Sequence, residues 1–155
     1  MRWWVTWYHK VTRDISTIPD ALDYYENEYQ VARTEVQLRG VVEKQAAEMP
    51  GVVEQRFCQL QEIEAILEHI NIQLRKIKTK HYKKFLESYN RALSSRDADK
   101  YADGEDEVID YETLVNEVAL MRNKWLGIIK SLDAKQFQIN NIVKLRAAGM
   151  EDARV

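Results

Sequence analysis

Glycine and proline are scarce in this chain of 155 residues, which contains 5 glycines and 2 prolines. Average usage would give roughly 18 of the two together in a chain of this length. Because these residues end helices and form turns, their scarcity predicts a structure of helices with few turns. Apolar residues make up 45% of the chain and charged residues 31%. This mixture predicts a folded protein, and the length is that of one domain.

Cysteine and long apolar runs are also lacking. Cys58 is the only cysteine, which excludes an intrachain disulfide and a zinc site built from several cysteines, and is usual in a reducing compartment. No apolar run approaches the roughly 20 residues that cross a membrane, and the opening residues carry charge too early for a signal peptide. The sequence therefore predicts a cytoplasmic protein with no membrane partner.

The net charge is close to zero, at −2, which excludes the general attraction to polyanions of a strongly basic protein. Its distribution along the chain is uneven. Residues 20–68 carry 11 acids and 4 bases, whereas residues 69–86 carry six bases and no acid. Residues 113–150 hold six bases and two acids. A nucleic-acid site must therefore be a local patch, and the two basic stretches would join into one surface if their helices folded back on each other.

Two long stretches repeat apolar residues at alternating spacings of three and four. The first lies in residues 52–93, which contain neither proline nor glycine, and the second in residues 114–132. This spacing places apolar residues on one face of a helix, as in coiled coils. We therefore expect two long helices, joined by the acidic stretch 94–110, that fold back as an antiparallel hairpin.

Shorter elements are expected on both sides of the hairpin. Residues 20–39 predict an amphipathic helix that packs beside it, and residues 49–51 predict a turn because they contain proline and glycine. Asp133 and Gln136 have the spacing of a capping box, which predicts a break and then a short C-terminal helix. The sequence thus predicts an all-α fold with an aromatic N-terminal arm at 1–19, a helical hairpin domain at 20–133 and a C-terminal oligomerisation helix at 134–150.

The first residues are rich in aromatic and basic side chains, in a stretch that looks strand-like or forms an arm. Such a mixture permits stacking on bases, whereas packing in the core or an interface is the alternative, because exposed tryptophans promote aggregation. The aromatic residues are Trp3, Trp4, Trp7 and Tyr8.

No motif of an enzyme active site is present, neither a glycine-rich phosphate loop, nor a nucleophile elbow, nor paired carboxylates. The three histidines, His9, His69 and His81, lack the spacing that places two of them on one helical face as a metal pair. The acidic stretch 94–110 departs from the calcium-loop pattern, whose third position would here be Tyr101. We therefore expect no catalysis, no metal and no cofactor, and a solvated loop at the acidic stretch.

The basic stretch provides the candidate nucleic-acid site. On a helical wheel Lys76, Lys80 and Lys83 lie opposite the apolar face, so they would face solvent. Phosphates attract such charges, and aromatic side chains among them can stack on unpaired bases. The alternative is a solvated helix face whose bases pair with acids of a neighbour. The candidate residues are Arg75, Lys76, Lys78, Lys80, Tyr82, Lys83 and Lys84.

The expected C-terminal helix has apolar residues on two faces. A short helix of this kind is covered from both sides, and one chain easily covers only one of them. The sequence therefore predicts a homo-oligomer contact. Ile139, Ile142 and Val143 lie on the face expected to dock on the hairpin or on one neighbour, and Phe137 and Leu145 lie on the face expected to meet another subunit.

Residues 135–149 resemble the C-terminal oligomerisation helix of the UvsY family of recombination mediators from T-even-like phages. The preceding parts follow in the order expected of that family: a basic, aromatic-containing helix at 75–89, a Tyr-Ala-Asp-Gly loop at 101–104 and an amphipathic helix at 111–132. The resemblance covers about the last 85 residues and is a pattern of residue types and spacings.

The resemblance implies a small non-enzymatic protein that forms rings and binds single-stranded DNA. Members of the family help to load a RecA-like recombinase onto strands coated with single-strand-binding protein. Their DNA contacts come from a basic helix, which here implies Arg75, Lys76, Lys78, Lys80, Lys83 and Lys84. The alternative from another class is a helical adaptor or structural phage protein that binds other proteins through its helix faces.

Overall fold

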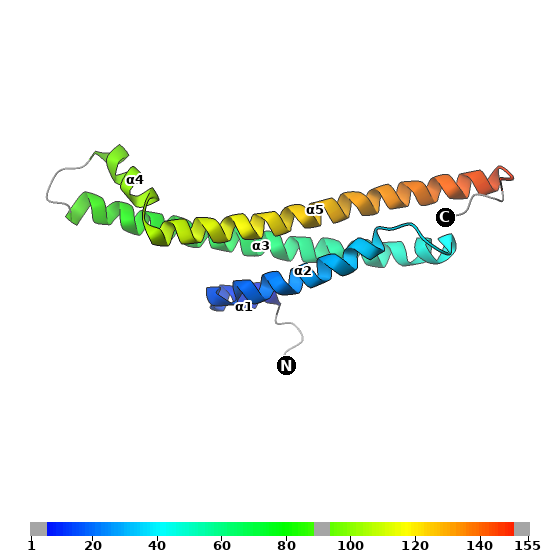
Figure 1. Cartoon of the computed structure of the whole chain (residues 1–155), viewed down its shortest axis with the longest axis horizontal. Helices are drawn as coiled ribbons and strands as arrows, with labels where there is room; N and C mark the ends of the chain where they lie inside the picture. The colour runs from blue at the N-terminus through cyan, green and yellow to red at the C-terminus, as the bar shows by residue number, and fades with distance from the viewer. Residues whose placement is uncertain (1–5, 89–93, 151–155) are drawn as a thin grey trace.

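The computed structural model describes residues 6–88 and 94–150, and every regular element in these two ranges is helical. Figure 1 shows two long helices that lie side by side in opposite directions, α3 (Val42–Ser88) and α5 (Asp106–Ala147). The expected all-α hairpin is therefore confirmed. The other elements are α1 (Trp7–Arg13), a 3-10 turn (Ile15–Thr17), α2 (Ile18–Glu35) and α4 (Ser95–Asp103).

Two apolar clusters hold the shorter helices on the hairpin. In the first, Trp125 of α5 and Tyr25 of α2 are fully buried with their rings edge to face, 6.4 Å apart, and Ile63 of α3 packs with them. In the second, Val42 and Leu132 join α3 to α5. Burying one large apolar side chain contributes roughly 1.5–3 kcal/mol, so these clusters supply the main attraction between the helices.

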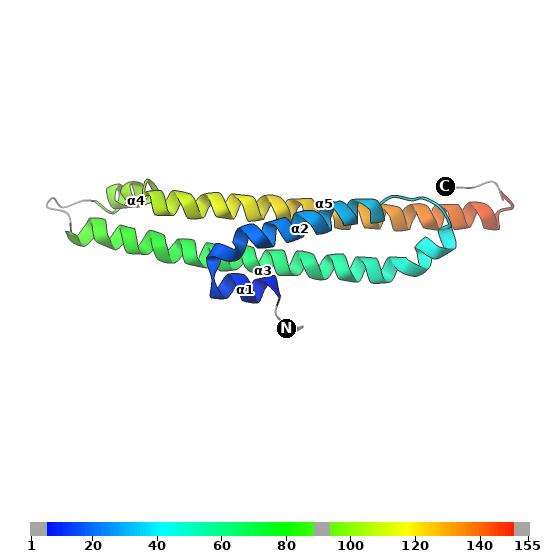
Figure 2. The same ribbon diagram turned by 60° about the horizontal axis from the view of Figure 1, so that its bottom comes forward.

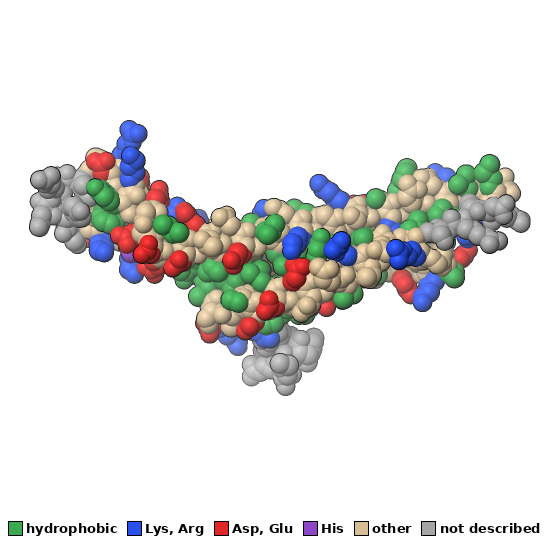
Figure 3. All heavy atoms as spheres, viewed as in Figure 1, with side chains coloured by type: hydrophobic (Ala, Val, Ile, Leu, Met, Phe, Trp, Pro, Cys, Tyr) green, Lys and Arg blue, Asp and Glu red, His purple; other side chains and the backbone are tan. Residues whose placement is uncertain are grey.

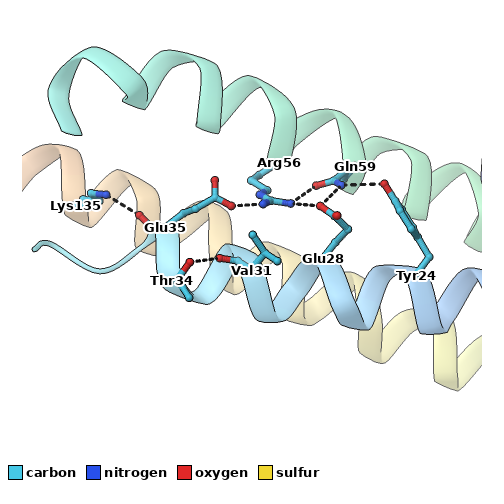
Figure 4. Close-up of polar contacts among 8 residues, drawn as sticks. All are labelled: Tyr24, Glu28, Val31, Thr34, Glu35, Arg56, Gln59 and Lys135. Carbon is cyan, nitrogen blue, oxygen red and sulfur yellow. Dashed lines mark hydrogen bonds and ion pairs between the residues drawn. The ribbon is translucent and has the colours of Figure 1, made fainter. Parts of the chain in front are cut away.

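Arg56 joins α2 to α3 by polar contacts (Figure 4). Its side chain is 3% exposed, and Nη1 donates to Oε2 of Glu28 at 2.6 Å and to Oε1 of Gln59 at 2.9 Å. Nη2 pairs with Glu35, and the guanidinium lies 5.6 Å from the centroid of the Trp125 ring. Hydrogen bonds from Gln59 and Arg56 lower the pKa of Glu28. Arg56 is therefore a buried cation that two carboxylates of α2 compensate.

The strand-like stretch expected at the N-terminus is wrong for the residues that form α1, because they are helical. This helix packs on α3, where the backbone N–H of Tyr8 donates to Oε1 of Glu62 at 3.2 Å. Trp7 and Tyr8 are half-buried, so packing accounts for these two aromatic residues. Trp3 and Trp4 lie outside the described residues.

The turn expected at residues 49–51 is also wrong, because α3 continues through Pro50 and Gly51. A proline inside a helix removes a hydrogen bond and costs roughly 3 kcal/mol. Met49 and Val42 are buried in the second cluster, so packing on α5 holds the helix turns before the proline. Figure 2 shows that α3 bends near this end, as helices that contain proline commonly do.

The break expected at Asp133 does not occur, because α5 runs without interruption to Ala147. The residues assigned to a separate C-terminal helix are therefore the last turns of α5. Leu132 and Ile139, on either side of the expected break, are both buried in the second cluster. Their packing continues the apolar face of the helix past the aspartate, which outweighs the local capping pattern.

The solvated loop expected at residues 94–110 is largely helical. The hydroxyl of Ser94 accepts the backbone N–H of Asp97 at 3.2 Å and so caps the start of α4. Ala98 and Ala102 are buried, and α4 packs on α3. Two small apolar residues one turn apart thus attach the connection to the hairpin, and Asp103 at the end of α4 comes to lie beside Lys78.

Candidate nucleic-acid interface

The candidate residues for nucleic-acid binding lie on the last turns of α3, where Ile70 is buried towards α5 and fixes the rotation of the helix. We call them the basic strip. Their exposure follows the helical wheel: Arg75, Lys76, Lys80, Lys83 and Lys84 are exposed, whereas Lys78 and Tyr82 are half-buried.

Acidic side chains of α4 and α5 neutralise part of the basic strip. Nζ of Lys78 lies 2.9 Å from Oε1 of Glu112 and 3.3 Å from Oδ1 of Asp103. The hydrogen bond to Glu112 is the main cause that raises the pKa of Lys78. Nζ of Lys80 lies 3.5 Å from Oε2 of Glu107. Pairing with acids of a neighbouring helix, the alternative weighed for this stretch, is therefore present at Lys78 and Lys80.

Glu107 also contacts the buried His81. Oε2 of Glu107 lies 2.9 Å from Nε2 of His81, and this hydrogen bond is the main cause that lowers the pKa of Glu107. His81 is 7% exposed. The pair connects the first turn of α5 to α3, next to the basic strip.

The charge that remains available on the strip is concentrated on its outer side. Within the two described ranges, Lys76 and Lys83 form no ion pair. Arg75 lies 3.4 Å from Glu68, but both side chains are more than 60% exposed, and pairs of this kind contribute little. Lys84 lies 5.8 Å from the ring centroid of the next residue. The outward face of α3 here is therefore positive.

Tyr82 lies in a groove of about 210 Å³ between α3 and α4. Lys78 lines the same groove, and Asp99 and Asp103 lie on its α4 side. Because Tyr82 is half-buried and faces two acids, a base would reach its ring only along this groove. Tyr82 is thus less accessible than the lysines around it.

The acidic partners are the part of this site that sequence reasoning missed. Residues 94–110 were expected as a solvated loop, so their carboxylates had no assigned position. The signal lay in the antiparallel pairing itself, because an acidic stretch at the start of the returning helix comes to lie beside the end of the first helix.

The basic residues of the stretch 113–150 do not join the basic strip into one surface. Lys124 pairs with Glu26 of α2 at 2.7 Å, and Arg146 pairs with Glu43 of α3 at 2.6 Å. The antiparallel hairpin places this end of α5 beside the acidic first part of α3. The expectation of one joined surface is therefore wrong.

The residues expected at an oligomer contact differ in exposure. Ile139 is 5% exposed and belongs to the second cluster, against which Ile142 also packs. Phe137, Val143 and Leu145 are 64%, 52% and 43% exposed. Ile139 and Ile142 therefore pack within the hairpin, and the other three are exposed on α5.

An apolar groove of about 470 Å³ lies between the first part of α3 and the last part of α5. Met49, Pro50 and Phe57 line it from α3, and Ile139 lines it from α5. Phe57 is 49% exposed. Exposed apolar surface of this kind commonly marks a contact between proteins.

Within residues 6–88 and 94–150, no three His, Cys, Asp or Glu side chains are grouped so that they would hold a metal ion. None of the helices in this part of the chain combines the length and the apolar character needed to cross a bilayer. Comparison of the chain with models of protein families, with curated proteins and with solved structures finds no match.

Proposed function

We propose that this protein is a non-enzymatic recombination mediator that binds single-stranded DNA with the basic strip and assembles into a homo-oligomeric ring. In this role it helps to load a RecA-like recombinase onto strands coated with single-strand-binding protein. The observation that carries the proposal is the exposed row of Lys76, Lys80 and Lys83 on a stretch of α3 without acids. The resemblance of residues 75–149 to the UvsY family in residue types and spacings supports the same function, although residues 101–103 lie in α4 and residues 134–147 continue α5.

The geometry of the row suits a phosphate backbone. Lys76, Lys80 and Lys83 span seven residues, or about 10 Å of helix axis. A nucleic-acid strand presents a phosphate about every 3.4 Å when its bases are stacked, so several phosphates lie within reach of three flexible ammonium groups. Binding of this kind depends on charge and not on base sequence, as a mediator that acts on any strand requires.

Self-assembly strengthens such contacts. One subunit offers few unpaired cations, and its intrinsic affinity is therefore low. When several subunits hold one strand, the later contacts form at a high effective concentration, which can raise the apparent affinity by roughly 10² to 10⁴. Phe137 and Leu145, both exposed on α5, are the residues we assign to the subunit contact.

The experiment is a salt titration of oligo-dT binding, measured by fluorescence anisotropy. We expect the triple variant Lys76→Ala, Lys80→Ala, Lys83→Ala to bind every oligonucleotide more weakly. The slope of log affinity against log salt should flatten by about 0.7 for each lost contact per subunit. The matched control removes three exposed lysines elsewhere, Lys44, Lys130 and Lys144. Equal affinities and slopes of the two folded variants would contradict the assignment of the site.

The alternative function is a helical adaptor that binds other proteins. The apolar groove beside Phe57 and the exposed Phe137 favour it, because both surfaces suit a helix of a partner protein. An adaptor would show no salt-dependent binding of oligo-dT. The same titration therefore separates the two functions.

A further inference from the structure

A third groove lies between α2 and α5 and is lined by aromatic, basic and amide side chains. It has a volume of about 460 Å³, within the usual range of small-ligand sites. Tyr29 and Arg33 line it from α2, and Asn123, Lys124 and Gly127 line it from α5. No Asp or Glu is among its lining residues. We call it the α2–α5 groove.

Two cations converge on one aromatic ring in this groove. Cζ of Arg33 lies 5.9 Å from the centroid of the Tyr29 ring, and Nζ of Lys124 lies 5.3 Å from it. Lys124 is held by Glu26 at 2.7 Å, whereas Arg33 forms no ion pair in the part of the chain that the structure describes. Figure 3 shows Lys and Arg side chains grouped over the line where α2 and α5 meet. Glu26 neutralises part of the charge of Lys124, so an anionic group would contact Arg33 first and would reach Lys124 only in competition with Glu26.

Gly127 keeps the α2–α5 groove open, and the fold does not require a glycine there. It lies in the interior of α5, where glycine is the least favourable residue after proline. An added Cβ would meet nothing within 4 Å, and its backbone has no positive φ. A longer side chain at this position would lean back over Asn123 and Lys124, because helical side chains point towards the preceding turn. A long side chain at position 127 would therefore occupy the groove, whereas nothing in the packing around Gly127 requires a glycine.

We propose that the α2–α5 groove binds one nucleotide of the single strand, as a second contact that rests on the function proposed above. The phosphate contacts Arg33 and displaces Glu26 from Lys124, and the base lies against Tyr29 and the apolar side chain of Val36. The amide of Asn123 faces the edge of the base, since amides both donate and accept hydrogen bonds. An aromatic ring next to cations is the arrangement that single-strand sites use for stacking.

The groove lies away from the basic strip along the hairpin. Glu112 contacts Lys78 of the strip, and Gly127 follows Glu112 by 15 residues on the same helix, which is about 22 Å. A strand with stacked bases covers that distance with about seven nucleotides. Longer oligonucleotides should therefore use both sites, and very short ones only one.

The first test fills the groove without changing its charge. We expect Gly127→Leu to weaken the binding of a fluorescent oligo-dT of twenty nucleotides by about fivefold or more, because stacking of one base contributes a factor of that order. Asn116→Leu is the matched control, since Asn116 is also exposed on α5 but does not line the groove. Both variants are compared by circular dichroism and light scattering, so that a change in fold or assembly is recognised.

The second test removes the charge of Arg33, the cation of the groove for which the described residues provide no ion pair. Arg33→Gln should weaken binding and flatten the salt slope by about 0.7 per subunit, whereas Arg39→Gln, at an exposed position outside the groove, should not. An oligonucleotide that contains 5-iodouracil should crosslink to Tyr29 on irradiation, and Gly127→Leu should suppress that crosslink. A glutamate peptide of twenty residues serves as a competitor of another chemical class.

The outcomes separate this proposal from the proposed function. If the wild type binds oligo-dT and the groove variants match their controls, the groove proposal is wrong and the function stands. If the groove variants lose affinity and the triple variant of the basic strip does not, the groove stands and the strip is not the site. If the wild type binds no oligo-dT, both are wrong. Displacement of the Tyr29 crosslink by the glutamate peptide at equal concentration would show a site for acidic peptides, which overturns the nucleotide assignment.

Discussion

Removing the acids that hold Lys78 should strengthen nucleic-acid binding. Asp103 and Glu112 both lie within 3.3 Å of Nζ of Lys78, so a phosphate must displace them before it can use this lysine. The double variant Asp103→Asn, Glu112→Gln keeps the size and the polarity of both side chains and removes their charges. We expect it to bind oligo-dT more tightly than the wild type.

The magnitude follows from the exposure of the partners. The side chains of Lys78, Asp103 and Glu112 are 37%, 61% and 43% exposed, so solvent screens both pairs. An ion pair of this kind contributes about 0.2–1 kcal/mol. Loss of both pairs therefore frees about 0.4–2 kcal/mol, which corresponds to about 2- to 30-fold tighter binding.

The assay is fluorescence anisotropy with oligo-dT at fixed salt. The control variant Glu117→Gln, Asp133→Asn removes the same charge from exposed positions of α5 that form no ion pair in the described part of the chain. Both variants reduce the general repulsion of the strand equally. Any difference between them therefore measures the local release of Lys78.

Equal affinities of the double variant and its control would refute this reasoning. The carboxylates beside Lys78 would then have no effect on its use by phosphates. Weaker binding by the double variant would also refute it, and would indicate that the pairs position α4 for binding and do not compete with it.

Three further changes test the fold and the assembly. Arg56→Ala leaves the carboxylates of Glu28 and Glu35 without their cation. Their side chains are 27% and 21% exposed, so we expect the free energy of unfolding in urea to fall by about 3 kcal/mol, the lower end of the range for a broken buried pair. Leu145→Glu should lower the light-scattering mass and leave the helix content unchanged, whereas Leu120→Glu should not change the mass, although Leu120 is also exposed. Hydrogen bonds from Gln59 and then from Arg56 lower the pKa of Glu28 in the folded state. The stabilisation by this carboxylate is therefore complete above the ordinary value of 4.5 and is lost as the pH falls through the lower folded value. Thermal unfolding should therefore show Tm falling below about pH 4.5, and less steeply in Glu28→Gln.

The fold was predictable where periodicity continues over many turns. The three-four alternation in residues 52–93 and 114–132 describes helix faces that are buried in the structure, and the hairpin follows from it. Local signals were misleading where packing opposed them. Pro50 lies inside α3 because Met49 packs beside it, and α5 passes Asp133 because Leu132 and Ile139 continue its buried face.

The candidate site was predictable in part, for a different reason. A helical wheel gives the direction of a side chain, so the exposure of Lys76, Lys80 and Lys83 followed from the sequence. The partners of Lys78 depend on which residues of another helix lie opposite, and no local pattern contains that information. The α2–α5 groove was not predictable from a local pattern either, because Tyr29 and Lys124 are far apart in the chain and meet only through packing.

The charges of the two long helices match in the antiparallel arrangement. The first part of α3 is acidic and its last turns are basic, whereas α5 begins with acids and continues with bases. Antiparallel packing therefore places Glu112 beside Lys78 at one end of the hairpin and Arg146 beside Glu43 at the other. A parallel pairing would bring acid to acid and base to base, and like charges at such contacts destabilise. The charge complementarity that favours this fold also neutralises part of the basic strip. A strand therefore first meets the charges of Lys76 and Lys83 on the outward face of α3.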